Sequence, residues 1–234
     1  MNFKKRKVKS THFSGLPPFS EQVLKRMRSN VTSLNDFRCV ELCNLCYEPD
    51  RGAAIDPHKD DEWLWGERLV TLNLLSDTAY CMLHESAATD TSEQQQVQKT
   101  VSSNEQSSPL PCFSSPISCI DIQASSFSSK TDLKSFSSVK SPIITVSESQ
   151  LSDVMIRIPL PRRSLVIIAG DARYTWLHSI RSEDIQSRRI GITFRELSSE
   201  FMEGGSRADE GQSLLATAET FKGVSVLESR TCKR

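Results

Sequence analysis

The pair His58 and Asp60 combines the residue types and spacing best suited to chemistry in this chain. In an extended segment, residues i and i+2 point to the same side, so one imidazole and one carboxylate can reach a single ion. Two histidines and one carboxylate on one face of an octahedron leave three positions open, an arrangement that suits non-haem Fe(II). The spacing therefore raises the hypothesis of an iron site that needs a second histidine.

The second histidine must come from one of the other three in the chain. His12 lies in a basic N-terminal segment, and His84 borders a Ser-rich segment. His178 follows an apolar run and a glycine turn, so it is the best placed of the three. A His-x-Asp spacing alone arises often by chance, and the alternative leaves His58 at the surface and Asp60 as a solvated acid before a turn.

Two arginines could supply an anion site on one strand. Arg189, Thr193 and Arg195 are separated by even numbers of residues, so they share one face of the strand. Buried guanidinium groups without anionic partners are costly, and arginine matches carboxylates through two parallel hydrogen bonds. A small dicarboxylate would satisfy both arginines. The alternative is an exposed face on which they pair with Glu183 or Glu196.

Composition excludes some function classes. Lys plus Arg equal Asp plus Glu at 29 each, so no global field attracts nucleic acid, which would need a local basic patch. No apolar run approaches the roughly 20 residues that span a bilayer, so we expect no membrane association through a span. The N-terminus has no apolar stretch after its charged start, and we expect no secretory signal.

The cysteines indicate a reducing compartment, the cytoplasm or the nucleus. There are seven, an odd number with irregular spacing, unlike a disulfide framework. Cys43 and Cys46 could hint at zinc, but no second pair of matching ligands follows, which favours inert thiols. The basic run at residues 4–9 is either a nuclear import signal or phosphate contact, or a solvated terminus.

The hydrophobic pattern predicts a mainly β domain with flanking helices, a β-sandwich or jelly roll. Strands are expected at 68–75, 154–160, 164–170 and 189–195. Helices are expected at 20–27, with Ser20 as the N-cap, and at 207–222.

The middle of the chain differs in composition from its flanks. Residues 86–150 contain 19 Ser, too polar a segment to form a core, and we interpret them as a disordered insertion. Residues 1–85 and 151–222 are then one discontinuous domain, followed by a flexible tail at 223–234.

Together, three segments resemble the AlkB-homologue family of dioxygenases. They are residues 43–76 with the His-x-Asp pair, 158–178 with the later histidine, and 187–201 with the Arg-x-x-x-Thr-x-Arg strand. The resemblance is greatest to the fourth animal subfamily and covers most of 2–85 and 151–222. Members of that subfamily extend further at the N-terminus, so we expect this chain to lack part of their fold, with activity dependent on whether the rest suffices.

The resemblance implies a double-stranded β-helix (jelly roll) that uses Fe(II), 2-oxoglutarate and O2. It implies three iron ligands: His58, Asp60 and His178. It implies a cosubstrate site made of five residues: Arg189, Arg195, Tyr47, Thr193 and Asn44. Asn44 lies one residue upstream of the family position, and Gly191 replaces the usual Asn or Ser.

The resemblance also implies oxidative demethylation. The expected substrate is methylated lysine in a protein, cytoskeletal or chromatin, with N6-methyladenine in DNA as the rival. Trp63 and Trp65 are candidates to line the substrate entrance, although Trp65 could equally belong to the core. Two other functions stay open: a catalytically inactive scaffold, and a prolyl-hydroxylase-like enzyme, which usually has a single basic cosubstrate anchor.

Overall fold

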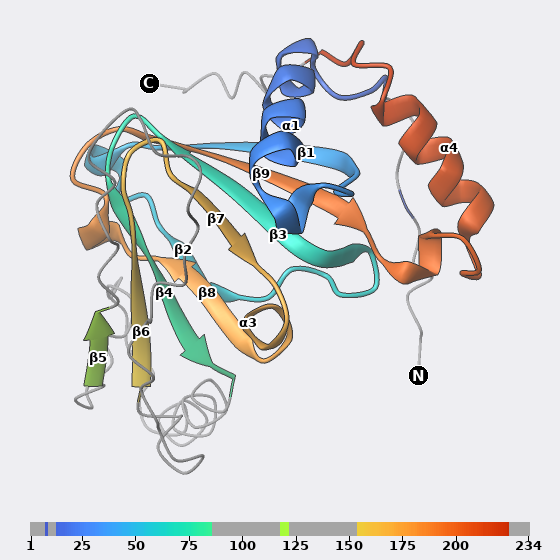
Figure 1. The fold of residues 1–234 in the computed structure, drawn as a ribbon. Coiled ribbons are helices and arrows are strands. Elements are labelled where there is room, and N and C mark those ends of the chain that lie inside the picture. The colour runs from blue at the N-terminus through green and yellow to red at the C-terminus, as the bar shows by residue number, and fades with distance from the viewer. Residues whose placement is uncertain (1–7, 9–12, 86–117, 122–153, 225–234) are drawn as a thin grey trace, which may run out of the picture.

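Two mainly antiparallel sheets, one of them flanked by helices, make up the architecture of the chain (Figure 1). The structure is a computed structural model and describes residues 8, 13–85, 118–121 and 154–224. The four-stranded sheet has the order β1 (Cys39–Tyr47), β9 (Arg189–Leu197), β3 (Trp65–Leu74) and β7 (Leu165–Ile168). The five-stranded sheet has the order β2 (Ile55–His58), β8 (Trp176–Ile180), β4 (Thr78–His84), β6 (Val154–Leu160) and β5 (Ser118–Asp121).

Helices α1 (Pro18–Asn30) and α4 (Ala208–Ala218) lie on the outer side of the four-stranded sheet (Figure 1). The larger core joins them to β3 and β9, and its buried members include Leu24, Met27, Val70, Phe194 and Leu215. Short helical turns complete the chain: η1 (Thr32–Leu34), η2 (Pro49–Arg51), α3 (Asp171–Tyr174), η4 (Ser182–Asp184) and η5 (Ser199–Phe201).

A second core lies between the two sheets, and this placement follows from the alternation of β9. Ile192 and Phe194 face the helices and join the larger core. The residues between them in the alternation therefore face the other sheet. The second core has seven buried residues: Tyr47, Leu69, Tyr80, Leu160, Ile168, Ile180 and Ile185. The polar face of β9 thus opens into the space between the sheets, where the chemistry is expected.

The expected jelly-roll class is confirmed, and each expected strand is present with bounds close to those predicted. One detail of the first helix was wrong. Ser20 is not its N-cap, because α1 begins two residues earlier, after Pro17. Proline is well suited to the start of a helix, since its fixed φ is helical and its missing N–H needs no partner there. The Ser20 hydroxyl instead donates to the Pro17 carbonyl oxygen at 2.6 Å.

Most of the Ser-rich segment lies outside the described residues, as do 225–234 of the expected tail and most of the basic run at 4–9. Two short stretches of these segments are among the described residues. Residues 118–121 of the Ser-rich segment form β5, parallel to β6. At the start of the tail, the Gly223 N–H donates to the Leu16 carbonyl oxygen at 3.0 Å. Across the described part of the chain, no helix is both long and apolar enough to cross a membrane.

Candidate functional site

His58, Asp60 and His178 come together at one end of the five-stranded sheet. β2 ends at His58, and its antiparallel pairing with β8 places His178 directly opposite. The two imidazole rings lie 4.3 Å apart between centroids, and Asp60 follows in the loop after β2. One ligand atom from each residue lies within 4.8 Å of the others. Among the described residues, this is the one group of histidine, cysteine and acidic side chains arranged to hold an ion.

A hydrogen bond orients the His58 imidazole, and burial favours the neutral form of the His178 imidazole. His58 Nδ1 lies 2.8 Å from the Asp56 carbonyl oxygen, which leaves its Nε2 turned to Asp60, 4.0 Å from the carboxylate. His178 is only 9% exposed and makes a T-shaped contact with the Tyr80 ring, with 5.9 Å between the centroids. Burial, aided by the nearby His58, lowers the pKa of His178 to about 4. A neutral imidazole at physiological pH is the form that binds metals.

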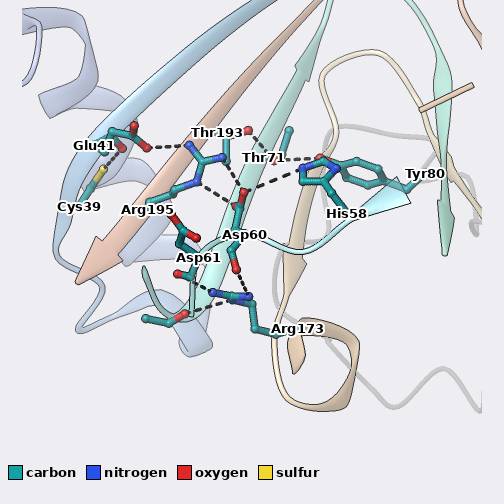
Figure 2. Close-up of polar contacts among 11 residues, drawn as sticks. Cys39, Glu41, His58, Asp60, Asp61, Thr71, Tyr80, Arg173, Thr193 and Arg195 are labelled. Atoms are coloured by element: carbon teal, nitrogen blue, oxygen red, sulfur yellow. Dashed lines mark hydrogen bonds and ion pairs between the residues drawn. The ribbon is translucent and has the colours of Figure 1, made fainter. Parts of the chain in front are cut away.

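The Asp60 carboxylate is paired with Arg195 (Figure 2). Arg195 Nε and Nη2 donate to its two oxygens at 2.9 Å and 3.1 Å, and Nη1 donates to Glu41 at 2.6 Å. Burial raises the pKa of Asp60, but the Arg195 guanidinium outweighs it and the net pKa lies below the usual value. Asp60 is therefore an anion at neutral pH, as an iron ligand must be.

A buried arginine fixes the loop that carries Asp60 (Figure 2). Arg173 lies in α3 and is almost fully buried. Its guanidinium donates to the carbonyl oxygens of Asp60 at 3.0 Å and Asp61 at 3.3 Å. Because these are main-chain contacts, Arg173 holds the position of the loop without taking up the Asp60 carboxylate.

Arg189 lies on the same face of β9 as Arg195, deeper between the sheets. It is 1% exposed, its Nε donates to Asn73 Oδ1 at 2.6 Å, and its guanidinium lies 4.6 Å from the centre of the Tyr47 ring. Its Nη1 and Nη2 are buried without a hydrogen-bond partner. Buried charged donors are costly to leave unpaired. These two nitrogens are therefore the feature of the cavity that most clearly indicates an anion-binding site.

The cavity between the two arginines has a polar floor. Thr193 contacts Thr71 at 3.1 Å between their hydroxyl oxygens, and the Tyr80 hydroxyl donates to Thr71 at 3.2 Å. Gly191 lies between the arginines on β9, and the cavity is also bordered by Tyr47. Burial raises the pKa of Tyr47 to about 12, so its phenol remains a hydrogen-bond donor at physiological pH.

Three of the expected site residues lie elsewhere. Asn44 faces away from the cavity, because the cavity is lined by its neighbour Leu45 and by Tyr47, and side chains alternate along β1. Trp63 packs against Phe201 in the larger core, with 6.0 Å between the ring centroids. Trp65 contributes to both cores and lies beneath the Arg195 guanidinium, so neither tryptophan lines the cavity.

Five residues that shape the site were not predicted: Glu41, Thr71, Asn73, Tyr80 and Arg173. A signal existed for Asn73, which is a polar residue between two leucines near the end of a predicted strand. A similar signal existed for Arg173, which lies five residues before the predicted histidine ligand. The alternative partners named for the β9 arginines, Glu183 and Glu196, are not used; Glu196 pairs with Arg68 instead.

The side chains present fit an iron ion and a dicarboxylate. The donor set of two imidazoles and one carboxylate is the one that leaves positions open on non-haem Fe(II). The cavity joins that set to Arg189, whose two free donors match the two oxygens of a carboxylate. A zinc site at Cys43 and Cys46 does not fit, since these residues lie an odd number apart on β1 and so face opposite sides.

Three curated proteins are similar to this chain in sequence. Human and mouse proteins named alpha-ketoglutarate-dependent dioxygenase alkB homolog 4 are each 41% identical to the chain over 224 residues, 95% of this chain and 62% of each relative. The chain is similar to AlkB-homologue dioxygenases over nearly all of its length. A Caenorhabditis elegans protein named DNA N6-methyl adenine demethylase is 28% identical over 206 residues, 88% of this chain and 48% of that protein. No protein-family model matches the chain.

The similarity to the AlkB homologues extends over nearly the whole chain, whereas the chain spans less than two thirds of the length of the curated relatives that it matches. The aligned part holds the two-sheet fold, the His-Asp-His group and the arginine-bearing strand. These are the components that the AlkB-homologue resemblance implied from the sequence.

Proposed function

We propose that this chain is an Fe(II)- and 2-oxoglutarate-dependent dioxygenase that removes N-methyl groups by oxidation. The observation that carries the proposal is one cavity that joins the His58, Asp60 and His178 group to the partnerless donors of Arg189. An inert scaffold would have no need to keep a buried guanidinium whose nitrogens lack partners.

Each part of the site has a role in this reaction. His58, Asp60 and His178 would hold the iron, and Arg189 and Arg195 would bind the carboxylates of 2-oxoglutarate, with Tyr47 and Thr193 as hydrogen-bonding neighbours. Bound Fe(II) would supply the chemistry in which O2 and 2-oxoglutarate give succinate and CO2 while a methyl group is hydroxylated and leaves as formaldehyde. The protein groups hold geometry and charge, and none is needed as a general acid or base.

Methylated lysine in a protein, cytoskeletal or chromatin, is the proposed substrate. The chain has no excess of basic residues overall, which argues against the strong phosphate attraction that a DNA enzyme uses. The exposed Leu45 borders the cavity and offers an apolar contact for the methylene chain of a lysine. N6-methyladenine in DNA is the second candidate, since it is the substrate class in the name of the nematode relative.

A product assay separates these candidates. Purified protein with Fe(II), 2-oxoglutarate and O2 is given methylated lysine peptides or DNA oligonucleotides that contain N6-methyladenine, and formaldehyde and succinate are measured. The proposal expects equal amounts of both products with the lysine peptides and only uncoupled succinate with DNA. The reverse pattern would replace the substrate, and no stimulation by either would reject both assignments.

The cytoplasm and the nucleus are the proposed locations. Four cysteines in the described residues are free, as a reducing compartment favours: Cys39, Cys43, Cys46 and Cys81. A fluorescent fusion is expected to distribute between the two compartments. Replacing the lysines and arginine at 4–9 by alanine would deplete the nuclear fraction if this run is an import signal, and a fusion confined to a secretory organelle would reject the proposal.

A further inference from the structure

Arg189 is positioned by one side chain, that of Asn73 on the neighbouring strand β3. The Nε of Arg189 donates to Asn73 Oδ1 at 2.6 Å, and neither residue is more than 1% exposed. Within the described residues, Nη1 and Nη2 of Arg189 have no hydrogen-bond partner, so the bond from Nε to Asn73 is what fixes the guanidinium. The orientation of those nitrogens therefore depends on the direction of the Asn73 amide.

The Asn73 amide is itself held on its other side. Its Nδ2 donates to three main-chain carbonyl oxygens, at 2.9, 2.9 and 3.1 Å: those of Ser76, Leu160 and Pro161. Its main chain also bonds the β6–β7 turn, since Asn73 N donates to Ser164 at 2.9 Å and Asn73 O accepts from Arg163 at 2.7 Å. An amide with its nitrogen so engaged cannot flip, so Oδ1 stays turned to Arg189.

Two neighbours limit the remaining freedom of the guanidinium. The Tyr47 ring lies 4.6 Å from it. On the side of Gly191, even a single added Cβ would come within 3.1 Å of Arg189 Nη2, so the guanidinium already fills the space that a side chain would need. Arg195 differs, because it is held by two carboxylates of its own, Asp60 and Glu41.

We propose that Asn73 is a positioning residue for the cosubstrate: its amide oxygen sets the Arg189 guanidinium so that Nη1 and Nη2 face the cavity and accept a carboxylate. The inference rests on the proposed function, in that the carboxylate belongs to 2-oxoglutarate. The inference also couples cosubstrate binding to the β6–β7 turn, because the same Asn73 amide donates hydrogen bonds to Leu160 and Pro161. Cosubstrate affinity then depends on how that turn packs on β3.

The test measures binding of 2-oxoglutarate by calorimetry to protein loaded with Mn(II), which avoids turnover. Asn73→Ser shortens the side chain and removes the oxygen at the Oδ1 position, and we expect roughly tenfold weaker binding, as for loss of a hydrogen bond to a charged group. Mn(II) affinity should stay the same, because Asn73 does not contact the His-Asp-His group. Asp77→Ala is the matched control: Asp77 Oδ1 accepts from Arg162 N of the same turn at 2.6 Å without contacting Arg189.

A double-mutant cycle separates positioning from a general structural role. In the background of Arg189→Lys, which has no Nε–H donor, Asn73→Ser should change the affinity for 2-oxoglutarate by less than about twofold, since coupled residues are not additive. An Asn73→Ser effect that is the same in both backgrounds, or an Asp77→Ala loss as large as that of Asn73→Ser, would overturn the inference.

Two other outcomes are distinguishable. If Asn73→Ser does not fold, Asn73→Thr keeps more of the buried volume and still has no oxygen at the Oδ1 position, so it should also weaken binding of the cosubstrate. Unchanged affinity in Asn73→Thr would overturn the inference. Wild-type protein that binds Mn(II) but no 2-oxoglutarate would instead reject the proposed function, and the inference with it.

Discussion

Asp60 and Arg195 are joined by two hydrogen bonds, so a candidate iron ligand and a candidate cosubstrate anchor form one ion pair. The pair is largely buried, with 11% and 16% of the two side chains exposed. Glu41, which is more exposed, is the second partner of the same guanidinium. The positive charge of Arg195 therefore compensates the negative charge of Asp60, a candidate iron ligand. Removal of Arg195 leaves the Asp60 carboxylate without its cationic partner.

Arg195→Met is expected to destabilise the metal-free protein by about 3–5 kcal/mol, the usual cost of breaking a buried pair by removing one partner. Urea unfolding followed by tryptophan fluorescence measures the change. Glu41→Gln is the matched variant, because it removes a half-exposed partner of the same arginine and should cost no more than about 1 kcal/mol. Equal costs for the two variants would contradict the account of Asp60.

Gly211→Ala is expected to destabilise the protein, although alanine is normally the better helix former. Gly211 lies in α4 where the helix meets η5, and an added Cβ would lie 1.8 Å from the Phe201 carbonyl oxygen. Forcing extra volume into a packed contact costs typically about 1–3 kcal/mol. Thermal unfolding should show a lower midpoint for this variant.

The control for this effect is the next residue in the helix. Gln212 is exposed, so Gln212→Ala should change stability by less than about 0.5 kcal/mol. A Gly211→Ala protein as stable as wild type would show that α4 does not approach η5 as closely as described.

Thiol reactivity at pH 8 should distinguish the cysteines of β1. Burial raises the pKa of Cys39 to about 12, so almost none of it is thiolate at pH 8, whereas Cys46 is exposed. Iodoacetamide followed by peptide mass spectrometry is expected to modify Cys46 rapidly and Cys39 only after unfolding in guanidinium. Equal labelling rates in the folded protein would contradict the placement of β1 against the helices.

Local sequence was sufficient to predict four of the strands, β3, β6, β7 and β9, and the parts of the site that repeat at a fixed spacing. It did not predict five others: β1, β2, β4, β5 and β8. The arginines and Thr193 were placed on one face because the period of a strand is two, and the structure shows that face lining the cavity. The same parity could have rejected Asn44, since Tyr47 was expected in the site and lies an odd number of residues away. That parity was not applied because β1 was not among the predicted strands.

Long-range contacts account for the residues that were missed. Arg173 reaches the Asp60 loop across 113 positions of sequence, and Asn73 reaches Arg189 across 116. Neither contact has a local periodicity from which to predict it. The two tryptophans were proposed for the substrate entrance from their proximity to Asp60 in sequence; in the structure Trp63 packs on the larger core and Trp65 on both cores, outside the cavity lining.

Succinate formation from 2-oxoglutarate, measured with and without Fe(II), tests the central claim most directly. The account predicts Fe(II)-dependent succinate from the wild-type protein, its loss in Asp60→Ala and His178→Ala with the fold intact by circular dichroism, and its retention in His84→Ala, which changes a histidine that packs on Trp176 outside the site. Succinate formation that persists in folded Asp60→Ala and His178→Ala, or that is absent from folded wild-type protein with Fe(II) bound, would contradict it.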